Sequence, residues 1–299
     1  MIIWLGILAS LGTAFSWSLA TIINTETSSH VGIIHFFMMR QPVAAIMLGI
    51  VALLAGQFTW YPPHAIIYTG LSGILGLIFC DYCLYRSVPL IGIRSAMICQ
   101  CLYSCWTAVF GTIFLHEYLG IQGILGLLIA TAGVILVITH ERKDAHTGVN
   151  DPGQRRLGLI LGLASGVFMA IGLVLSKQAL NDGIPPVMLA CIRNAASWAV
   201  LWICAGFLGH LATAWAAAKA YPAVLKRVPL GCLFGPAGGV WLSTVALDIL
   251  PAAVASTLIG MQPIALLILT GIRERRIPAR GSILGSILAC AGAALLILR

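Results

Sequence analysis

Three ionisable side chains stand inside long apolar segments of this chain. Asp81 lies in FCDYCLYR, Arg40 in FFMMRQP and Arg193 in LACIRNA. Each such residue costs about 2.5–3.5 kcal/mol at the middle of a membrane on the insertion scale, so residues of this kind usually serve substrates, ions or protons. A guanidinium can hold a carboxylate, and a carboxylate can take up a proton when its ion pair is disrupted. The residue types therefore predict binding and proton transfer.

Polar and aromatic side chains accompany these charges. Gln100 and Gln262 are amides that can both donate and accept hydrogen bonds, and several Trp and Tyr residues offer aromatic surface. The alternative for each Trp is lipid-facing packing, and for the two arginines it is a structural ion pair or a contact with backbone carbonyls. We expect a substrate site made of Trp17, Tyr82, Tyr85, Gln100, Tyr103, Arg193, Trp241, Ser243 and Gln262, with Asp81 and Arg40 as ion-coupling residues.

Asp81 and Arg40 are expected to form an ion pair. Each lies a few residues from the same face of the predicted topology, so the two charges share a depth, and pairing lowers the cost of burying both. The second half of the chain keeps the cation as Arg193 but has Ser243 where Asp81 would be. This difference leaves Arg193 to meet a substrate carboxylate and makes Asp81 the candidate proton-coupling group. A static ion pair that only holds two helices together is the alternative.

Signatures of enzymes and metal sites are absent from the sequence. The chain has no H-E-x-x-H, G-x-S-x-G or P-loop motif. A soft-metal path is one interpretation of the five cysteines within 26 residues, but cysteine also packs between helices as a small apolar residue, and we favour that interpretation. These cysteines are Cys80, Cys83, Cys99, Cys101 and Cys105. We therefore expect no catalytic residue, metal or cofactor.

The composition identifies the elements that must position these residues. Of the 299 residues, 60% are apolar and 9% are charged, and the mean hydropathy is +1.01. Soluble domains carry about 25% charged residues, and a soluble chain of this size cannot bury so much apolar surface. The net charge of +8 would suggest nucleic acid in a soluble protein, but here the basic residues lie mostly in a few loops. The chain is therefore expected to be an all-α polytopic membrane protein.

Ten apolar runs have the length of transmembrane helices, because a hydrocarbon core about 30 Å thick needs about 20 residues. A polar stretch, HERKDAHTGVNDPGQRR, separates the first five from the last five. An interfacial helix is predicted at 210–226. The predicted spans are 2–24, 33–55, 65–86, 93–115, 121–139, 157–180, 187–209, 229–247, 252–271 and 281–298.

The two halves of the chain repeat each other. An offset of 162 superposes Pro89 on Pro251 and Gln100 on Gln262, and an offset of 153 superposes Arg40 on Arg193. Each half has five helices in the same order, and because five is odd the halves must insert with opposite orientation. We therefore predict two inverted five-helix repeats, at 1–139 and 157–299, joined by a polar linker at 140–156.

The chain resembles the EamA family of the drug/metabolite transporter superfamily. The resemblance covers nearly the whole chain and is carried by the Arg in the second helix of each half and by the junctions FLHEYLGIQGILGLLIATAG and GIRERRIPARGSILGSILACAG. The family's Glu maps onto Glu117 and Glu274. Its Gln-Pro turn survives as Gln262-Pro263 but is Gln100-Cys101 in the first half, which predicts a straighter helix there.

The resemblance implies a secondary transporter that exports small organic metabolites, such as amino acids or related amphipathic compounds, by alternating access. Its partners would be the small-molecule substrate and the lipid bilayer, with proton coupling through Asp81 as one energy source and the solute's own gradient as the other. Nucleic acid is not expected. A lipid-linked carrier or flippase of the same fold and a non-transporting scaffold or sensor are the alternatives. The oligomeric state is left open.

The basic residues predict an orientation in the membrane. Thirteen of the 17 Lys and Arg residues fall in or beside the loops between spans three and four, five and six, seven and eight, and nine and ten, against Lys177 and Arg299 on the other face. The positive-inside rule makes the first face cytoplasmic and places both termini outside a bacterial inner membrane. Members of the EamA family usually keep their termini inside, so charge and resemblance give opposite orientations.

Overall fold

The computed structural model describes residues 2–140, 151–207, 209, 216, 219–274 and 279–297. Every regular element in this part of the chain is a helix, and ten helices are long and apolar enough to cross a membrane. Each predicted span overlaps one of these ten, and the ends agree within five residues. The predicted all-helical membrane fold is therefore confirmed. About half of the predicted interfacial helix at 210–226 lies outside the described residues, and its last three residues begin the helix Val224–Cys232.

Several of the membrane spans are built from more than one element. The elements are α1 (Ile2–Val31), α2 (Ile33–Leu54), α3 (Pro63–Gly73), η1 (Ile74–Phe79), α4 (Cys80–Ile91), α5 (Ile93–Cys101), α6 (Tyr103–Phe114), α7 (Ile121–His140), α8 (Pro152–Asn181), α9 (Pro186–Phe207), α11 (Val224–Cys232), η2 (Leu233–Ala237), α12 (Gly238–Ile249), α13 (Ala252–Ile259), α14 (Gln262–Glu274) and α15 (Arg280–Ile297).

Distortions occur at corresponding places in the two halves. The third and eighth spans contain the π-helical segments η1 and η2, and the fourth and ninth spans are each divided into two α-helices. The prediction of a straighter fourth span stays a prediction: the single residue Leu102 separates α5 from α6, whereas Gly260 and Met261 separate α13 from α14. The residues just before Leu102 pack closely against α8. A Cβ added to Gly166 of α8 would lie 3.1 and 3.2 Å from the carbonyl oxygens of Cys99 and Gln100.

The contacts of the chain divide it into two compact units. Unit 1 comprises Met1–Ile74 and Leu175–Ile249, and unit 2 comprises Leu75–Val174 and Leu250–Arg299. Each unit takes helices from both halves of the sequence. The predicted repeats at 1–139 and 157–299 follow the order of the sequence and do not coincide with these two units. Their boundaries stay a prediction.

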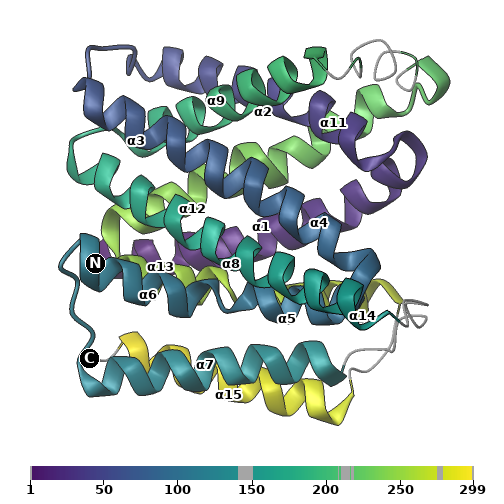
Figure 1. Cartoon of the computed structure of the whole chain (residues 1–299). Helices are drawn as coiled ribbons and strands as arrows, with labels where there is room; N and C mark the ends of the chain where they lie inside the picture. The colour runs from purple at the N-terminus through teal and green to yellow at the C-terminus, as the bar shows by residue number, and fades with distance from the viewer. Residues whose placement is uncertain are drawn as a thin grey trace. The chain divides into compact units, whose positions relative to one another are not determined.

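In unit 1, α2 packs along α9, and α1 packs against α11, η2 and α12 (Figure 1). Trp202 Nε1 donates to the Met38 carbonyl oxygen at 3.0 Å, and the Cys191 thiol lies 3.9 Å from the Ala45 carbonyl oxygen. Residue numbers rise along α2 as they fall along α9, so these two helices are antiparallel. Arg40 and Arg193 therefore lie at different levels of the unit.

In unit 2, α7 and α15 pack along each other with their backbones in contact (Figure 1). A Cβ added to Gly133 would lie 2.6 Å from the Gly285 carbonyl oxygen, and one added to Gly292 would lie 2.6 Å from that of Gly126. Small residues allow this approach in lipid, where close packing rather than the hydrophobic effect joins helices. The glycines of the first junction, on α7, thus pack directly against those of the second junction, on α15.

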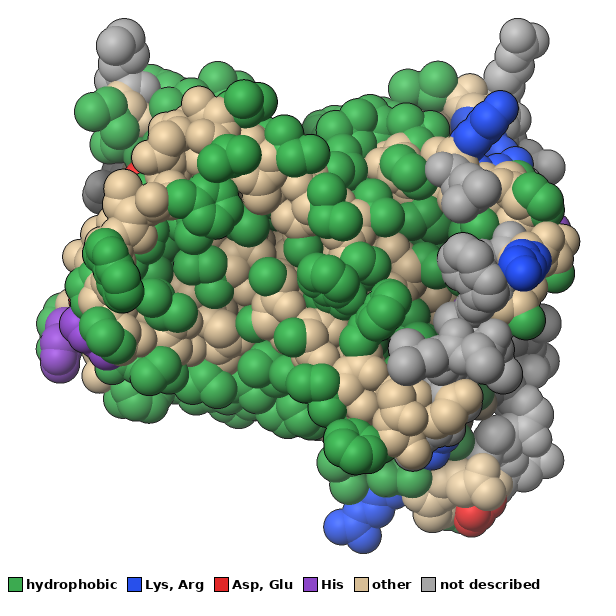
Figure 2. Space-filling model, turned by 90° about the horizontal axis from the view of Figure 1, so that it is seen from above, with side chains coloured by type: hydrophobic (Ala, Val, Ile, Leu, Met, Phe, Trp, Pro, Cys, Tyr) green, Lys and Arg blue, Asp and Glu red, His purple; other side chains and the backbone are tan. Residues whose placement is uncertain are grey.

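The surface is apolar to an extent that only a bilayer accommodates. Large side chains such as Leu54, Phe207 and Ile121 are more than four-fifths exposed. Figure 2 shows hydrophobic side chains over most of one face. Exposed apolar patches of this extent mark membrane contact in a protein with ten candidate spans.

Candidate functional site

The predicted site residues are distributed over both units. Unit 1 holds Trp17, Arg40, Arg193, Trp241 and Ser243, and unit 2 holds Asp81, Tyr82, Tyr85, Gln100, Tyr103 and Gln262. The two members of the predicted Asp81–Arg40 pair belong to different units, so that pair stays a prediction.

Arg193 is the largest fully buried side chain of the described residues. It is 2% exposed, and α9 brings its backbone directly against Gly73, the last residue of α3. Any side chain at position 73 would collide with the Arg193 backbone, which is why a glycine stands there. Within the described residues no carboxylate pairs with Arg193, and its Nε has no hydrogen-bond partner.

The π-helix η2 packs against α9, the helix that carries this arginine. Gly238 donates to the Leu233 carbonyl, five residues back, so the Phe234 carbonyl loses its usual helical partner. Ser16 of α1 donates to Phe234 at 2.5 Å, and Asn194 of α9 donates to the Pro236 carbonyl at 3.1 Å. Side chains of α1 and α9 thus satisfy backbone groups that the distortion frees, as the membrane interior requires.

Trp17 faces the same element. A Cβ at Gly235 would lie 3.8 Å from the Trp17 ring, and one at Gly239 would lie 2.8 Å from its Nε1. The structure therefore brings the predicted site residue Trp17 and Asn194, the neighbour of Arg193 on α9, to one distorted segment. Ser243 is buried and donates to the carbonyl of Val240 on its own helix, while Trp241 is 40% exposed.

Arg40 occupies another level of unit 1. Its guanidinium carbon lies 4.4 Å from the centre of the Phe37 ring, a cation–π geometry, and the side chain is 4% exposed. The Cys232 thiol donates to the Arg40 carbonyl oxygen at 3.3 Å. The aromatic ring gives this buried cation a local partner.

Three further polar residues belong to the interior of unit 1 and were missed from the sequence. Gln41 and Asn194 are at most 1% exposed, and their side-chain oxygens have no hydrogen-bond partner within the described chain; the same holds for Trp198 Nε1. Buried polar atoms almost always have partners, so several partnerless ones on α2 and α9 indicate a place for water or a polar ligand. Gln41 and Asn194 each directly follow an arginine of the repeat, and that adjacency is the signal that could have found them.

Unit 2 uses its polar side chains differently. Tyr103 is buried, and its hydroxyl donates to the Ser256 carbonyl of α13 at 2.9 Å. Gln100 Nε2 lies 3.4 Å from the Cys80 sulfur, and Gln262 begins α14 directly after the break in the ninth span. Glu117 accepts from the backbone N–H of Ala252 at 2.7 Å and so caps α13.

The remaining predicted residues of unit 2 lie nearer the surface. Tyr82 and Tyr85 are 59% and 41% exposed, and Asp81 is half-buried. Four of the five clustered cysteines are buried. No group of three His, Cys, Asp or Glu side chains with metal-binding geometry occurs in the described ranges.

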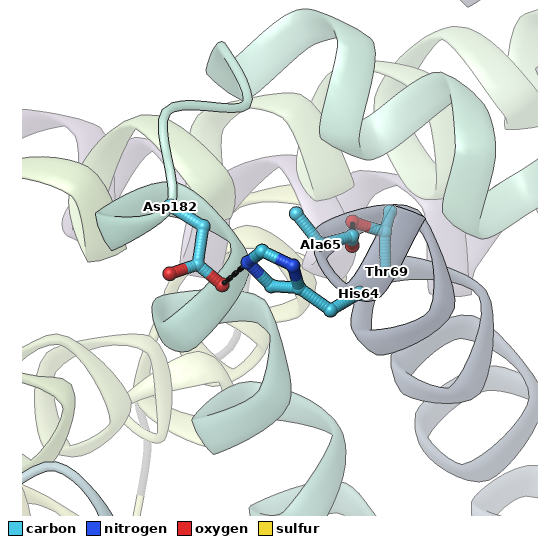
Figure 3. Close-up of polar contacts among 4 residues, drawn as sticks. All are labelled: His64, Ala65, Thr69 and Asp182. Atoms are coloured by element: carbon cyan, nitrogen blue, oxygen red, sulfur yellow. Dashed lines mark hydrogen bonds and ion pairs between the residues drawn. The ribbon is translucent and has the colours of Figure 1, made fainter. Parts of the chain in front are cut away.

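A second polar group lies at one end of unit 1. His64 Nε2 of α3 lies 3.5 Å from the Asp182 carboxylate just after α8 (Figure 3). Lys177 of α8 is 9% exposed, and its ammonium donates to the Leu247 carbonyl oxygen at 2.6 Å. The sequence predicted only which face of the membrane Lys177 lies nearer.

Comparison with known proteins decides the family. The model of the EamA-like transporter family matches residues 4–139 and 156–298. The chain belongs to this family. As an EamA-like protein it is a multi-pass membrane protein of a transporter family.

One solved structure, titled only "Crystal structure of protein", has the same fold as this EamA-like chain. It has a TM-score of 0.74 and 17% identity, over 99% of this chain and 96% of the other. At this identity the likeness concerns the fold alone. No curated protein matches the chain.

Proposed function

We propose that the protein is a secondary transporter that exports small organic metabolites bearing a carboxylate, such as amino acids or related amphipathic compounds. Membership of the EamA-like family supports transport. The observation that supports a carboxylate-bearing substrate concerns Arg193. This arginine is 2% exposed and has no paired carboxylate among the described residues. A buried cation without a counterion is costly, and an anionic substrate would lower that cost.

The chemistry of the guanidinium suits this role. Its planar N–H donors match the two oxygens of a carboxylate and can form two parallel hydrogen bonds. Asn194, the next residue of α9, adds a buried amide group that would orient the rest of the solute. Trp17, beside η2, would contribute apolar surface.

The mechanism would be alternating access driven by a gradient. Inverted repeats supply two related arrangements in many transporters, and no nucleotide-binding motif is present. Protons through Asp81 and Arg40 are the proposed coupling path, and Tyr82, Tyr85, Gln100, Tyr103, Trp241, Ser243 and Gln262 complete the proposed substrate contacts. The protein would reside in a bacterial inner membrane with both termini outside. A reporter fluorescent only in the cytoplasm, fused after Arg299, tests that orientation, because its fluorescence would contradict it.

Ligand-induced stabilisation tests the substrate proposal directly. Purified protein is heated with a panel of small carboxylates and with their amide or alcohol counterparts, since a ligand that binds the folded state raises its stability. We expect the carboxylates alone to stabilise the wild type, and liposomes containing the protein to equilibrate the same compounds. Arg193→Gln should abolish the stabilisation, while Arg156→Gln, which removes an exposed arginine of α8, should retain it. Equal stabilisation by the amides would contradict the proposal.

A further inference from the structure

One end of unit 1 carries a histidine–carboxylate contact between two spans. His64 is the second residue of α3, and Asp182 follows the last residue of α8. The distance from His64 Nε2 to Asp182 Oδ2 is 3.5 Å, and the side chains are 59% and 20% exposed (Figure 3). The two side chains point toward each other from different helices, so the contact joins α3 to the end of α8.

Two other polar contacts close the same end. The ammonium of Lys177 donates to the carbonyl oxygens of Leu247 at 2.6 Å and Asp248 at 3.4 Å, at the end of α12. A cation stabilises a helix C-terminus, where the carbonyl groups lack helical partners. Thr244 of α12 donates to the Pro186 carbonyl at the start of α9, at 2.9 Å. Polar contacts therefore join α3, α8, α9 and α12 at one level.

The His64–Asp182 contact differs from the others in containing a histidine. A lysine and a hydroxyl keep their state across the neutral range, whereas histidine is the side chain that gains its charge between about pH 8 and pH 5. The other charged or titratable side chains of the elements that meet here are Tyr68, whose ring lies 6.1 Å from that of His64, then Lys177 and the exposed Asp248. On α9 the first charged residue is Arg193, seven residues beyond Pro186.

We propose that His64 and Asp182 form a proton-binding latch that holds this end of unit 1 closed when His64 is protonated. Protonation creates an ion pair between α3 and the end of α8, and deprotonation removes the attraction while Lys177 keeps α12 in place. The latch strengthens as pH falls and weakens as pH rises. Both residues adjoin loops predicted to face outside, so the latch would respond to external pH. Its effect on transport rests on the proposed function, but the latch itself does not.

Hydrogen exchange measured by mass spectrometry tests the latch without any substrate. The protein, in lipid nanodiscs, is labelled at about pH 5.5 and about pH 8, with labelling times corrected for the intrinsic pH dependence of exchange. We expect peptides covering 57–70 and 178–188 to exchange about two- to fivefold more slowly at the lower pH, the effect of one partly exposed ion pair. A peptide covering 43–56, which contains no ionisable side chain, serves as the internal reference.

Variants distinguish the latch from a general effect of pH. His64→Gln and Asp182→Asn should remove the pH difference and exchange as the wild type does at high pH, whereas His64→Lys should keep the slow exchange at both pH values. His30→Gln is the matched control, because His30 is a histidine of the same unit that stacks on Tyr221 with ring centres 4.5 Å apart. His30→Gln should leave the difference in exchange rate between the two pH values unchanged.

Two results would overturn the latch. One is an equal exchange rate of wild-type 57–70 and 178–188 at both pH values, and the other is a pH difference that persists in His64→Gln. Flux in liposomes separates this inference from the proposed function. An absence of flux with a pH-dependent exchange rate would overturn the transporter proposal and leave the latch. Flux with a pH-independent exchange rate would overturn the latch and leave the transporter proposal.

Discussion

The interiors of the two units differ in how their buried hydrogen-bonding groups are satisfied. In unit 2, Tyr103 and Ser104 both donate to the Ser256 carbonyl, and in the described part of this unit a buried side-chain atom without a partner occurs only at Ser282. In unit 1, Gln41, Arg193, Asn194 and Trp198 each have one. Satisfied polar groups stabilise a fold, and unsatisfied ones cost stability unless a ligand or water meets them. The comparison supports the proposal that a polar ligand binds in unit 1 rather than in unit 2.

The largest expected effect is on the packing of unit 2. Gly133→Leu should prevent folding, because its Cβ would already lie 2.6 Å from the Gly285 carbonyl oxygen and the rest of the side chain has no space. Gly120→Leu is the control, since no atom lies within 4 Å of a Cβ there. Size-exclusion chromatography and thermal unfolding measure both. A folded Gly133→Leu protein of wild-type stability would refute the close packing of α7 and α15.

Arg193→Gln tests whether the buried arginine of unit 1 binds a ligand or only supports the fold. Loss of a charged hydrogen-bonding group costs about 1.5–3 kcal/mol, so a bound carboxylate should lose about 10- to 150-fold in affinity. The ligand-free protein should be no less stable, because the variant removes a buried cation that has no paired carboxylate in the described chain. Titration calorimetry and thermal unfolding provide the two measurements. Marked destabilisation with unchanged affinity would make Arg193 structural.

Asp81→Asn tests whether unit 2 also has a coupling role. If Asp81 couples protons to transport, the folded variant should show flux that no longer responds to a pH gradient across liposomes. If it is only a structural partner, stability should fall and the remaining flux should respond as before. Wild-type flux that ignores pH would exclude the coupling role altogether.

The smallest expected effect is that of Tyr103→Phe. Removing one buried hydroxyl that donates to Ser256 should lower the free energy of unfolding by about 1 kcal/mol. This hydroxyl is already used within unit 2, so Tyr103 would contact the substrate through its ring, and carboxylate affinity should stay unchanged, in contrast to Arg193→Gln. A large fall in affinity with unchanged stability would show instead that the hydroxyl itself binds the substrate.

Much of the fold could be predicted because each span is a local property of the chain. Runs of about 20 apolar residues must be helical in a bilayer, so all ten were found and their ends agreed within five residues. The interruption at Leu102 was not predicted, because no proline stands near it in the sequence. The roles of Lys177 and Asn194 were missed because their partners are carbonyl groups about 40 to 70 residues away.

The sequence by itself determined the class of protein, the ten spans and which charges lie within them, because the cost of placing a side chain in hydrocarbon is set mainly by its own chemistry. Only the tertiary structure decided that contacts group helices of both halves into two units, and that Arg193 meets Gly73. It also decided that side chains of α1 and α9 satisfy the carbonyls of η2. Hydrogen bonds and close packing between helices join residues far apart in the chain, and hydropathy alone carries no information about such pairs.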